Sequence, residues 1–204
     1  SADGKSALCE LCGFDENCAI AKVIQDDYND TNLPVEIWLF QGLPKADKME
    51  LVIQKAVELG VYEIIPVATK RAVVKLDEKK SKSKITRWQA ISEAAAKQSK
   101  RAIIPKVADV TSFKEAIKDC QKVQVKVIPY ELAEGMEKTK EIISSLKPGQ
   151  DVAIFIGPEG GFEESEIEAA MEVGVIPVTL GKRILRTETA GFTILSWIMY
   201  QLEN

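Results

Sequence analysis

Hydrophobic residues follow two rhythms along most of this 204-residue chain. From about residue 35, short runs of β-branched and other apolar residues alternate with stretches in which apolar residues recur every three or four positions. The short runs are typical of buried strands, and the longer spacing is typical of amphipathic helices. Regular alternation of strand and helix predicts an α/β protein, with a parallel sheet and helices on both faces.

The expected strands share short apolar runs: 35–41, 62–67, 123–128, 152–156 and 175–180. The first expected helix has one apolar face and ends at Gly60 as a C-cap; its face consists of Met49, Val52, Ile53, Ala56 and Val57. A second helix carries an apolar stripe and ends before Pro105; the stripe is Ile85, Trp88, Ile91 and Ala95. Shorter helices are expected from Thr111 or Ser112 to Cys120 and over 137–146, and a final helix over 187–202.

The final helix is apolar on nearly every side, with Phe192, Ile194, Leu195, Trp197, Ile198, Met199 and Leu202. Such a helix is expected to be buried all round. In a small domain this indicates a subunit contact in addition to a core contact. The alternative is a fully internal helix.

Residues 1–31 differ from the rest of the chain. They alternate only weakly and carry turn signals at 15–17 and 26–30. We expect two or three short strands, too few to close a sheet of useful size. The domain boundary is therefore placed between residues 1–31 and 32–204.

Two glycine-containing loops mark the candidate site. Residues 157–161 (G-P-E-G-G) follow one expected strand and residues 181–186 (G-K-R-I-L-R) follow another, and a helix comes after each loop. Glycine lets the backbone approach a ligand closely, and a helix start offers free N–H groups. Two such loops would form one pocket at the carboxyl edge of the sheet. Neither loop has a phosphate-binding pattern, and Glu159, Glu163 and Glu164 would repel a phosphate, so a neutral or cationic ligand is expected.

The chain contains no histidine, which excludes Ser-His-Asp and Cys-His catalysis as well as a histidine general base within it. Of its four cysteines, Cys9 and Cys12 form a C-x-x-C pair, but further metal ligands are lacking nearby. Free thiols are the favoured interpretation, and they fit a reducing cytoplasm. No apolar run approaches the roughly 20 residues that span a bilayer, so no membrane contact is expected.

The net charge of −4 hides an uneven distribution. Residues 70–106 contain twelve Lys or Arg and only three acidic residues. A basic region on an acidic body is typical of a protein that directs RNA to one face. The alternative is a solvated loop and helix face.

Two sequence blocks carry a resemblance to a known family. I-G-P-E-G-G-F (156–162) and L-G-K-R-I-L-R-T-E-T-A (180–190) resemble the ribosomal RNA small subunit methyltransferase E family, as do 48–60, Lys70-Arg71 and 88–105. The resemblance implies a SPOUT-type fold with a C-terminal trefoil knot, and residues 1–31 as the last strands of a PUA-like β-barrel. It also implies a cytoplasmic homodimer that uses S-adenosylmethionine to methylate N3 of one uridine in 16S ribosomal RNA of the small subunit.

The resemblance also implies site residues. The cofactor positions are Pro129, Glu131, Leu132, Ile156, Gly157, Pro158, Glu159, Gly160, Gly161, Leu180, Gly181, Ile184 and Leu185. The RNA contacts are Lys70, Arg71, Gln98 and Arg101. We hypothesise that Arg186 stabilises negative charge on the uracil oxygens. Glu188 is then a proton acceptor or an orienting partner for Arg186, or simply a first-turn residue favoured by the helix dipole.

Two other functions remain open on the sequence. One is a SPOUT enzyme that modifies another RNA position, such as a ribose 2′-hydroxyl. The other is a catalytically silent RNA-binding or ribosome-assembly module.

Overall fold

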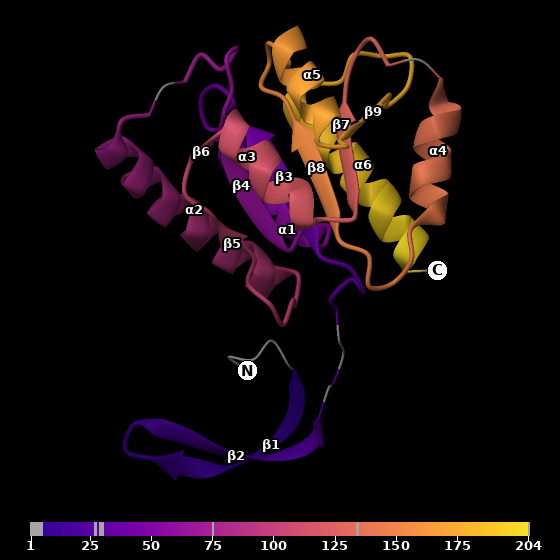
Figure 1. Ribbon diagram of the computed structural model, residues 1–204. Coiled ribbons are helices and arrows are strands. Elements are labelled where there is room, and N and C mark those ends of the chain that lie inside the picture. The colour runs from indigo at the N-terminus through magenta and orange to yellow at the C-terminus, as the bar shows by residue number, and fades with distance from the viewer. Residues whose placement is uncertain (1–5, 27, 29–30, 75, 134, 204) are drawn as a thin grey trace.

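The computed structural model describes residues 6–26, 28, 31–74, 76–133 and 135–203. Its strands form two separate sheets, which can be followed in Figure 1. The smaller sheet is an antiparallel hairpin of β1 (Ala7–Asp15) and β2 (Cys18–Asp26). The larger sheet and its helices form an α/β body that begins at β3.

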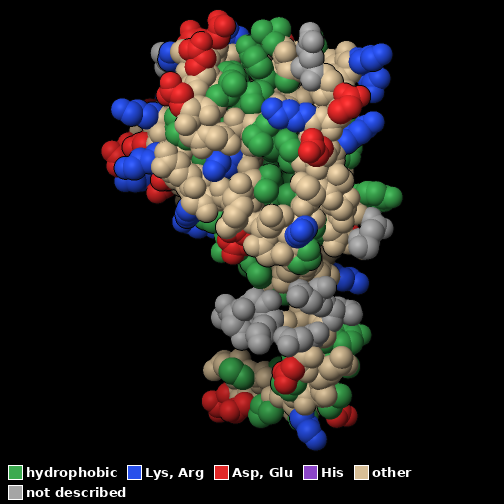
Figure 2. Space-filling view, turned by 45° about the vertical axis from the view of Figure 1, so that its right-hand side comes forward, with side chains coloured by type: hydrophobic (Ala, Val, Ile, Leu, Met, Phe, Trp, Pro, Cys, Tyr) green, Lys and Arg blue, Asp and Glu red, His purple; other side chains and the backbone are tan. Residues whose placement is uncertain are grey.

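Nearly all side chains of the hairpin are exposed, including Phe14 at 77% and Leu11 at 57%. Hydrophobic side chains are visible on its surface in Figure 2. The expectation of two or three strands before residue 32 is confirmed, with two among the residues described there. The turn expected at 26–30 lies partly outside the described residues, since 27, 29 and 30 are not among them.

The larger sheet is parallel throughout its described pairings, with strand order β5-β4-β3-β8-β7-β9 and β6 paired to β4. Its strands are β3 (Ile37–Gly42), β4 (Glu63–Ala68), β5 (Lys106–Val107), β6 (Thr111–Ser112), β7 (Val125–Pro129), β8 (Val152–Ile156) and β9 (Ile176–Val178). All five strands expected from the sequence are present; β8 has the expected ends, and the other four have shifted ends. The two-residue strands β5 and β6 are too short to leave a periodic signal.

Each helix expected from the apolar pattern is present. The helices are α1 (Lys48–Glu58), α2 (Glu78–Gln98), α3 (Phe113–Asp119), α4 (Met136–Ser145), α5 (Glu164–Glu172) and α6 (Thr187–Leu202), with a 3-10 turn, η1, at Cys120–Lys122. Gly60 follows α1 with a positive φ of 91°, as expected of a glycine at a helix end. Ser112 begins α3 in a reciprocal capping box with Glu115.

The helices cover both faces of the sheet because its strands carry apolar residues on both sides. In β3, Ile37 and Leu39 pack into a core shared with α1, α2 and α6. Phe40 points to the opposite face, where α3 and α5 supply the other core. There the rings of Phe40 and Phe155 stack with centroids 4.5 Å apart. The predicted three-layer α/β architecture is confirmed.

The final helix is not fully internal. Its buried residues include Ile194, Leu195 and Ile198, whereas Tyr200 is 72% exposed. Phe192 and Trp197 are only half-buried. The helix therefore has one side in the core and a partly apolar side left open. Among the described helices, none is both long and apolar enough to cross a membrane.

Candidate functional site at the carboxyl ends of three strands

A cavity of about 510 Å³ opens at the carboxyl edge of the parallel sheet. Three segments line it: residues 129–131 at the end of β7, residues 157–162 after β8, and residues 179–187 between β9 and the start of α6. In the sheet, β7 lies between β8 and β9. The loop after β7 is thus the middle wall, and the two glycine-containing loops flank it.

A close approach of backbones fixes the loop after β8. A Cβ atom added to Gly42, the last residue of β3, would lie 2.7 Å from Pro158 Cδ and 2.8 Å from Pro158 N. A Cβ on Gly157 would lie 3.1 Å from the backbone of Gly161. Only glycine fits both positions without movement of the loop, so these two glycines set its course over the end of β3.

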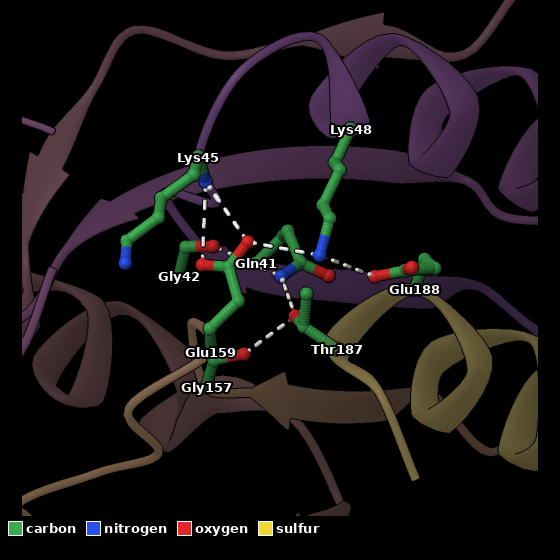
Figure 3. A network of polar contacts seen from close by, with 8 residues as sticks. All are labelled: Gln41, Gly42, Lys45, Lys48, Gly157, Glu159, Thr187 and Glu188. Carbon is green, nitrogen blue, oxygen red and sulfur yellow. Dashed lines mark hydrogen bonds and ion pairs between the residues drawn. The ribbon is translucent and has the colours of Figure 1, made fainter. Parts of the chain in front are cut away.

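A buried hydrogen-bonded chain joins three elements below the cavity (Figure 3). Gln41 in β3 is fully buried, and its Nε2 donates to Thr187 Oγ1 at 2.9 Å. Thr187 Oγ1 in turn donates to the carbonyl of Gly157 at 2.6 Å. Because buried polar groups are costly without partners, this chain holds the start of α6 against the loop after β8.

A lysine between two carboxylates forms the second polar link (Figure 3). Lys48 Nζ, from the first turn of α1, lies 3.1 Å from Glu159 Oε1 and 3.4 Å from Glu188 Oε2. Glu159 also accepts the backbone N–H of Lys45 at 3.1 Å. The hydrogen bond to Glu159 raises the pKa of Lys48 above its ordinary value, so the lysine is charged at neutral pH.

Glu159 is therefore not a free acid in the cavity. Desolvation acts to raise its pKa, but hydrogen bonds from backbone N–H groups and Lys48 outweigh it and hold the pKa below the ordinary value. The carboxylate is ionised and paired. The sequence argument used Glu159 only as a charge that would repel a phosphate, and its pairing with Lys48 could not be foreseen from that argument.

Replacing Lys48 by methionine is expected to lower kcat/KM of any reaction in this cavity about tenfold, because Glu159 and Glu188 lose the charge that fixes the loop and the start of α6. Steady-state kinetics of purified protein would measure this. Lys55→Met is the matched control: Lys55 lies in the same helix and pairs with Glu58 at 2.8 Å, away from the cavity. Equal loss in both variants would contradict the expectation.

Arg186 directly precedes α6 and lines the cavity. Within the described part of the chain, no hydrogen bond or ion pair holds its guanidinium group. Glu188 pairs with Lys48 instead of orienting Arg186, and it does not belong to the cavity wall. Three roles were considered for Glu188. The geometry favours the third, a first-turn residue of α6 that is paired with Lys48.

Twelve of the thirteen expected cofactor positions line the cavity; Leu132 does not and is 71% exposed. Wall residues that the sequence argument did not assign are Lys48, Tyr130, Phe162, Thr179, Lys182, Arg183, Thr187 and Ala190. Lys48 begins the block 48–60, one of those that carry the family resemblance. That block is the part of the sequence that could have pointed to Lys48 as a site residue.

The four expected RNA contacts divide between two places. Lys70 and Arg71 follow β4 at the carboxyl edge, and Arg71 Nη1 donates to the carbonyl of Gly160 at 3.2 Å. Gln98 ends α2. Arg101 Nη1 donates to the carbonyls of Val57 and Val61, which precede β4 at the opposite edge, at 3.1 and 2.6 Å.

Arg101 therefore has a structural role that the sequence argument did not give it. Its burial lowers the pKa to about 10, and its hydrogen bonds connect the end of α1 to the start of β4. The Val57 carbonyl also accepts the backbone N–H of Gly60 at 3.2 Å, so Arg101 adds a second donor at the end of α1. Arg101 is a structural residue in this geometry, and its contact with RNA stays a prediction.

The basic stretch 70–106 is partly paired on the surface. Ion pairs join Lys80 to Asp77, Lys82 to Glu78 and Lys97 to Glu93. Exposed pairs of this kind contribute little to stability and leave the charges accessible to a ligand. Lys75, also part of this stretch, lies outside the described residues.

Comparison with known proteins places this site in a family. A family model described as an RNA methyltransferase domain matches residues 31–199. Ribosomal RNA small subunit methyltransferase E of Bacillus subtilis (strain 168) is 41% identical over 206 residues, which cover 100% of this chain and 80% of that protein. The chain belongs to the ribosomal RNA small subunit methyltransferase E family.

Solved structures agree with membership of the methyltransferase E family. The crystal structure of the family member from Neisseria gonorrhoeae, bound to S-adenosyl methionine, matches with a TM-score of 0.77 and 34% identity, covering 95% of this chain and 78% of that one. A crystal structure of a protein described as hypothetical matches with a TM-score of 0.90 and 42% identity, covering 98% and 80% of the two chains.

The cavity fits the cofactor that the family implies. Its volume is in the range of small-ligand pockets, and Ile156, Leu180, Ile184 and Leu185 make part of its wall apolar. Gly161 and Gly181 have positive φ, and a Cβ there would meet nothing within 4 Å, so the backbone borders open space. The wall combines this backbone with side chains of both charges, among them Glu131, Glu159, Lys182 and Arg183, which suits a ligand that carries both a sulfonium and a carboxylate.

Proposed function

We propose that this protein is a methyltransferase that uses S-adenosylmethionine to methylate N3 of a specific uridine in 16S ribosomal RNA. The observation that carries the proposal is the glycine-built cavity at the ends of β7, β8 and β9, with the unpaired Arg186 in its wall. Relatives of the chain are named ribosomal RNA small subunit methyltransferase E, which supports the choice of substrate.

Different segments of the chain would contact different parts of the cofactor. Backbone groups of residues 157–161 and 180–185 would hold the cofactor, with Pro129 and Glu131 forming the middle wall. Leu132 is left out of this set, because it is 71% exposed and does not line the cavity. When bound, S-adenosylmethionine supplies an electrophilic methyl group. The loops mainly fix the orientation of the reactants, and such positioning can remove about 7–11 kcal/mol of a barrier.

Arg186 would act on the acceptor. The uracil imide must lose its N3 proton before or during attack, which places negative charge on the flanking oxygens. A guanidinium group without a protein partner can donate hydrogen bonds to those oxygens as the charge develops. Lys48 and Glu188 would hold the first turn of α6, and with it Arg186, in place.

RNA would approach the carboxyl edge of the sheet. Lys70 and Arg71 are exposed there beside Gly160, and the basic residues of α2 extend the positive surface. Contacts of this kind are led by phosphates and weaken with salt. Gln98 remains a proposed contact at the far end of α2.

Finer features of the fold belong to the same proposal. The chain leaves β9 at one edge of the sheet and returns in α6 to pack on β8 and α1, which is compatible with a C-terminal trefoil knot of SPOUT type. Residues 1–31 would be the remnant of a PUA-like barrel, and residues 32–204 the methyltransferase domain. The partly apolar open side of α6 supports a homodimer. We place its action in the cytoplasm, where small ribosomal subunits are found.

The decisive experiment is a methylation assay on small ribosomal subunits from a strain that lacks the activity, with mass spectrometry of the 16S RNA. Methylation at N3 of one uridine is the expected result. Methylation of a ribose 2′-hydroxyl would replace the proposal by a related SPOUT activity. Cofactor binding without methylation of subunits or free RNA would contradict it and favour a silent RNA-binding module.

A further inference from the structure

Glu166 in α5 is a buried acidic residue, only 4% exposed, that the proposed chemistry does not use. Its Oε1 accepts the backbone N–H of Lys70 at 2.9 Å. Its Oε2 accepts the backbone N–H of Glu163 at 2.9 Å. A carboxylate is costly to bury unless both oxygens are hydrogen-bonded. One side chain thus joins the segment after β4 to the loop after β8.

Further contacts join the same two segments. Lys70 Nζ lies 2.9 Å from Glu163 Oε2 and donates to Ser165 Oγ at 2.9 Å. Arg71 Nη1 donates to the carbonyl of Gly160 at 3.2 Å, and a Cβ added to Gly160 would lie 3.3 Å from Arg71 Cβ. The two segments are therefore in close packing contact as well as hydrogen-bonded.

This connection bridges a strand. In the sheet, β3 separates β4 from β8, so the Lys70-Arg71 segment reaches across the end of β3 to contact the loop after β8. The two sides of the bridge face different ligands. Lys70 and Arg71 are exposed, whereas Gly160 and Gly161 line the cavity.

We propose that Glu166 is a positioning residue that couples RNA binding at Lys70 and Arg71 to cofactor binding at Gly157–Gly161. This inference rests on the proposed function. RNA contact fixes the position of the Lys70-Arg71 segment. Because the Glu166 carboxylate is hydrogen-bonded to both segments, it then also fixes the loop that forms the cavity wall. Coupling of this kind is reciprocal: each ligand tightens the binding of the other by the same factor.

The test measures that factor directly. The affinity for S-adenosylhomocysteine, which permits no turnover, is determined by equilibrium dialysis with and without saturating small ribosomal subunits that lack the methylation. We expect subunits to tighten binding at least about fivefold in the unchanged protein. In Glu166→Gln, the amide can accept only one of the two N–H groups, and the factor should fall below about twofold.

Two further variants make the result specific. Glu168→Gln removes the same charge from an exposed position of α5 and should keep the full factor. Arg71→Lys keeps the charge that attracts RNA but loses the guanidinium geometry that reaches Gly160, and it should lower the factor. Because Arg71 is exposed, this variant decides the matter if Glu166→Gln does not fold.

An unchanged factor in both Glu166→Gln and Arg71→Lys would overturn the coupling, as would a factor of one in the unchanged protein. In either case the proposed methyltransferase function would stand, since both ligands still bind. If the unchanged protein bound no S-adenosylhomocysteine even with subunits present, both proposals would fall together.

Discussion

Replacing Arg186 by alanine is expected to lower kcat for methylation of small ribosomal subunits at least about 100-fold, the usual effect of removing a donor that faces developing charge. Arg186 lines the cavity, and in the described part of the chain its guanidinium has no other partner. Its loss should therefore remove an interaction with the acceptor and disturb little of the protein. Single-turnover kinetics at saturating cofactor would measure the effect.

Cofactor affinity separates this role from a general disturbance of the site. The dissociation constant for S-adenosylhomocysteine should change less than about threefold in Arg186→Ala, because the proposed cofactor contacts come from backbone and apolar side chains. Arg186→Lys should give intermediate activity, since a lysine keeps the charge without the planar pair of donors. Turnover within threefold of the unchanged protein in Arg186→Ala would refute the role.

Replacing Gly42 by alanine is expected to weaken cofactor binding at least about tenfold and to lower the free energy of unfolding by about 1–3 kcal/mol, the range for overpacking a filled site. The new Cβ would lie 2.7 Å from Pro158 Cδ and 2.8 Å from Pro158 N. Because the second of these is a backbone atom, the loop after β8 must move to relieve the contact. Calorimetry for cofactor binding and urea unfolding measure the two effects.

Gly13→Ala is the matched control for this change. Gly13 lies in β1, and an added Cβ there would meet nothing within 4 Å. That variant should keep cofactor affinity and stability close to those of the unchanged protein. If Gly42→Ala behaved in the same way, the glycine would not be what sets the course of the cavity loop.

Local sequence determined the elements of this protein and the kind of loops that border its cavity. Apolar spacing predicted the helix from Thr187 to Leu202 with both ends correct, and the strand-helix alternation predicted a parallel sheet. The glycines at 157, 160, 161 and 181 marked the cavity walls. These features could be predicted because backbone preferences and the spacing of buried side chains depend on residues only a few positions apart in the sequence.

Tertiary structure alone decided which distant residues meet. The order of the sheet put β7 between β8 and β9. Packing of α1 placed Lys48 between Glu159 and Glu188, and Arg101 turned to backbone carbonyls instead of the surface. Some ion pairs and buried hydrogen bonds join residues more than a hundred positions apart, such as Gln41 and Thr187. No local pattern encodes such contacts, because their free energy depends on burial and geometry that exist only after the layers have packed.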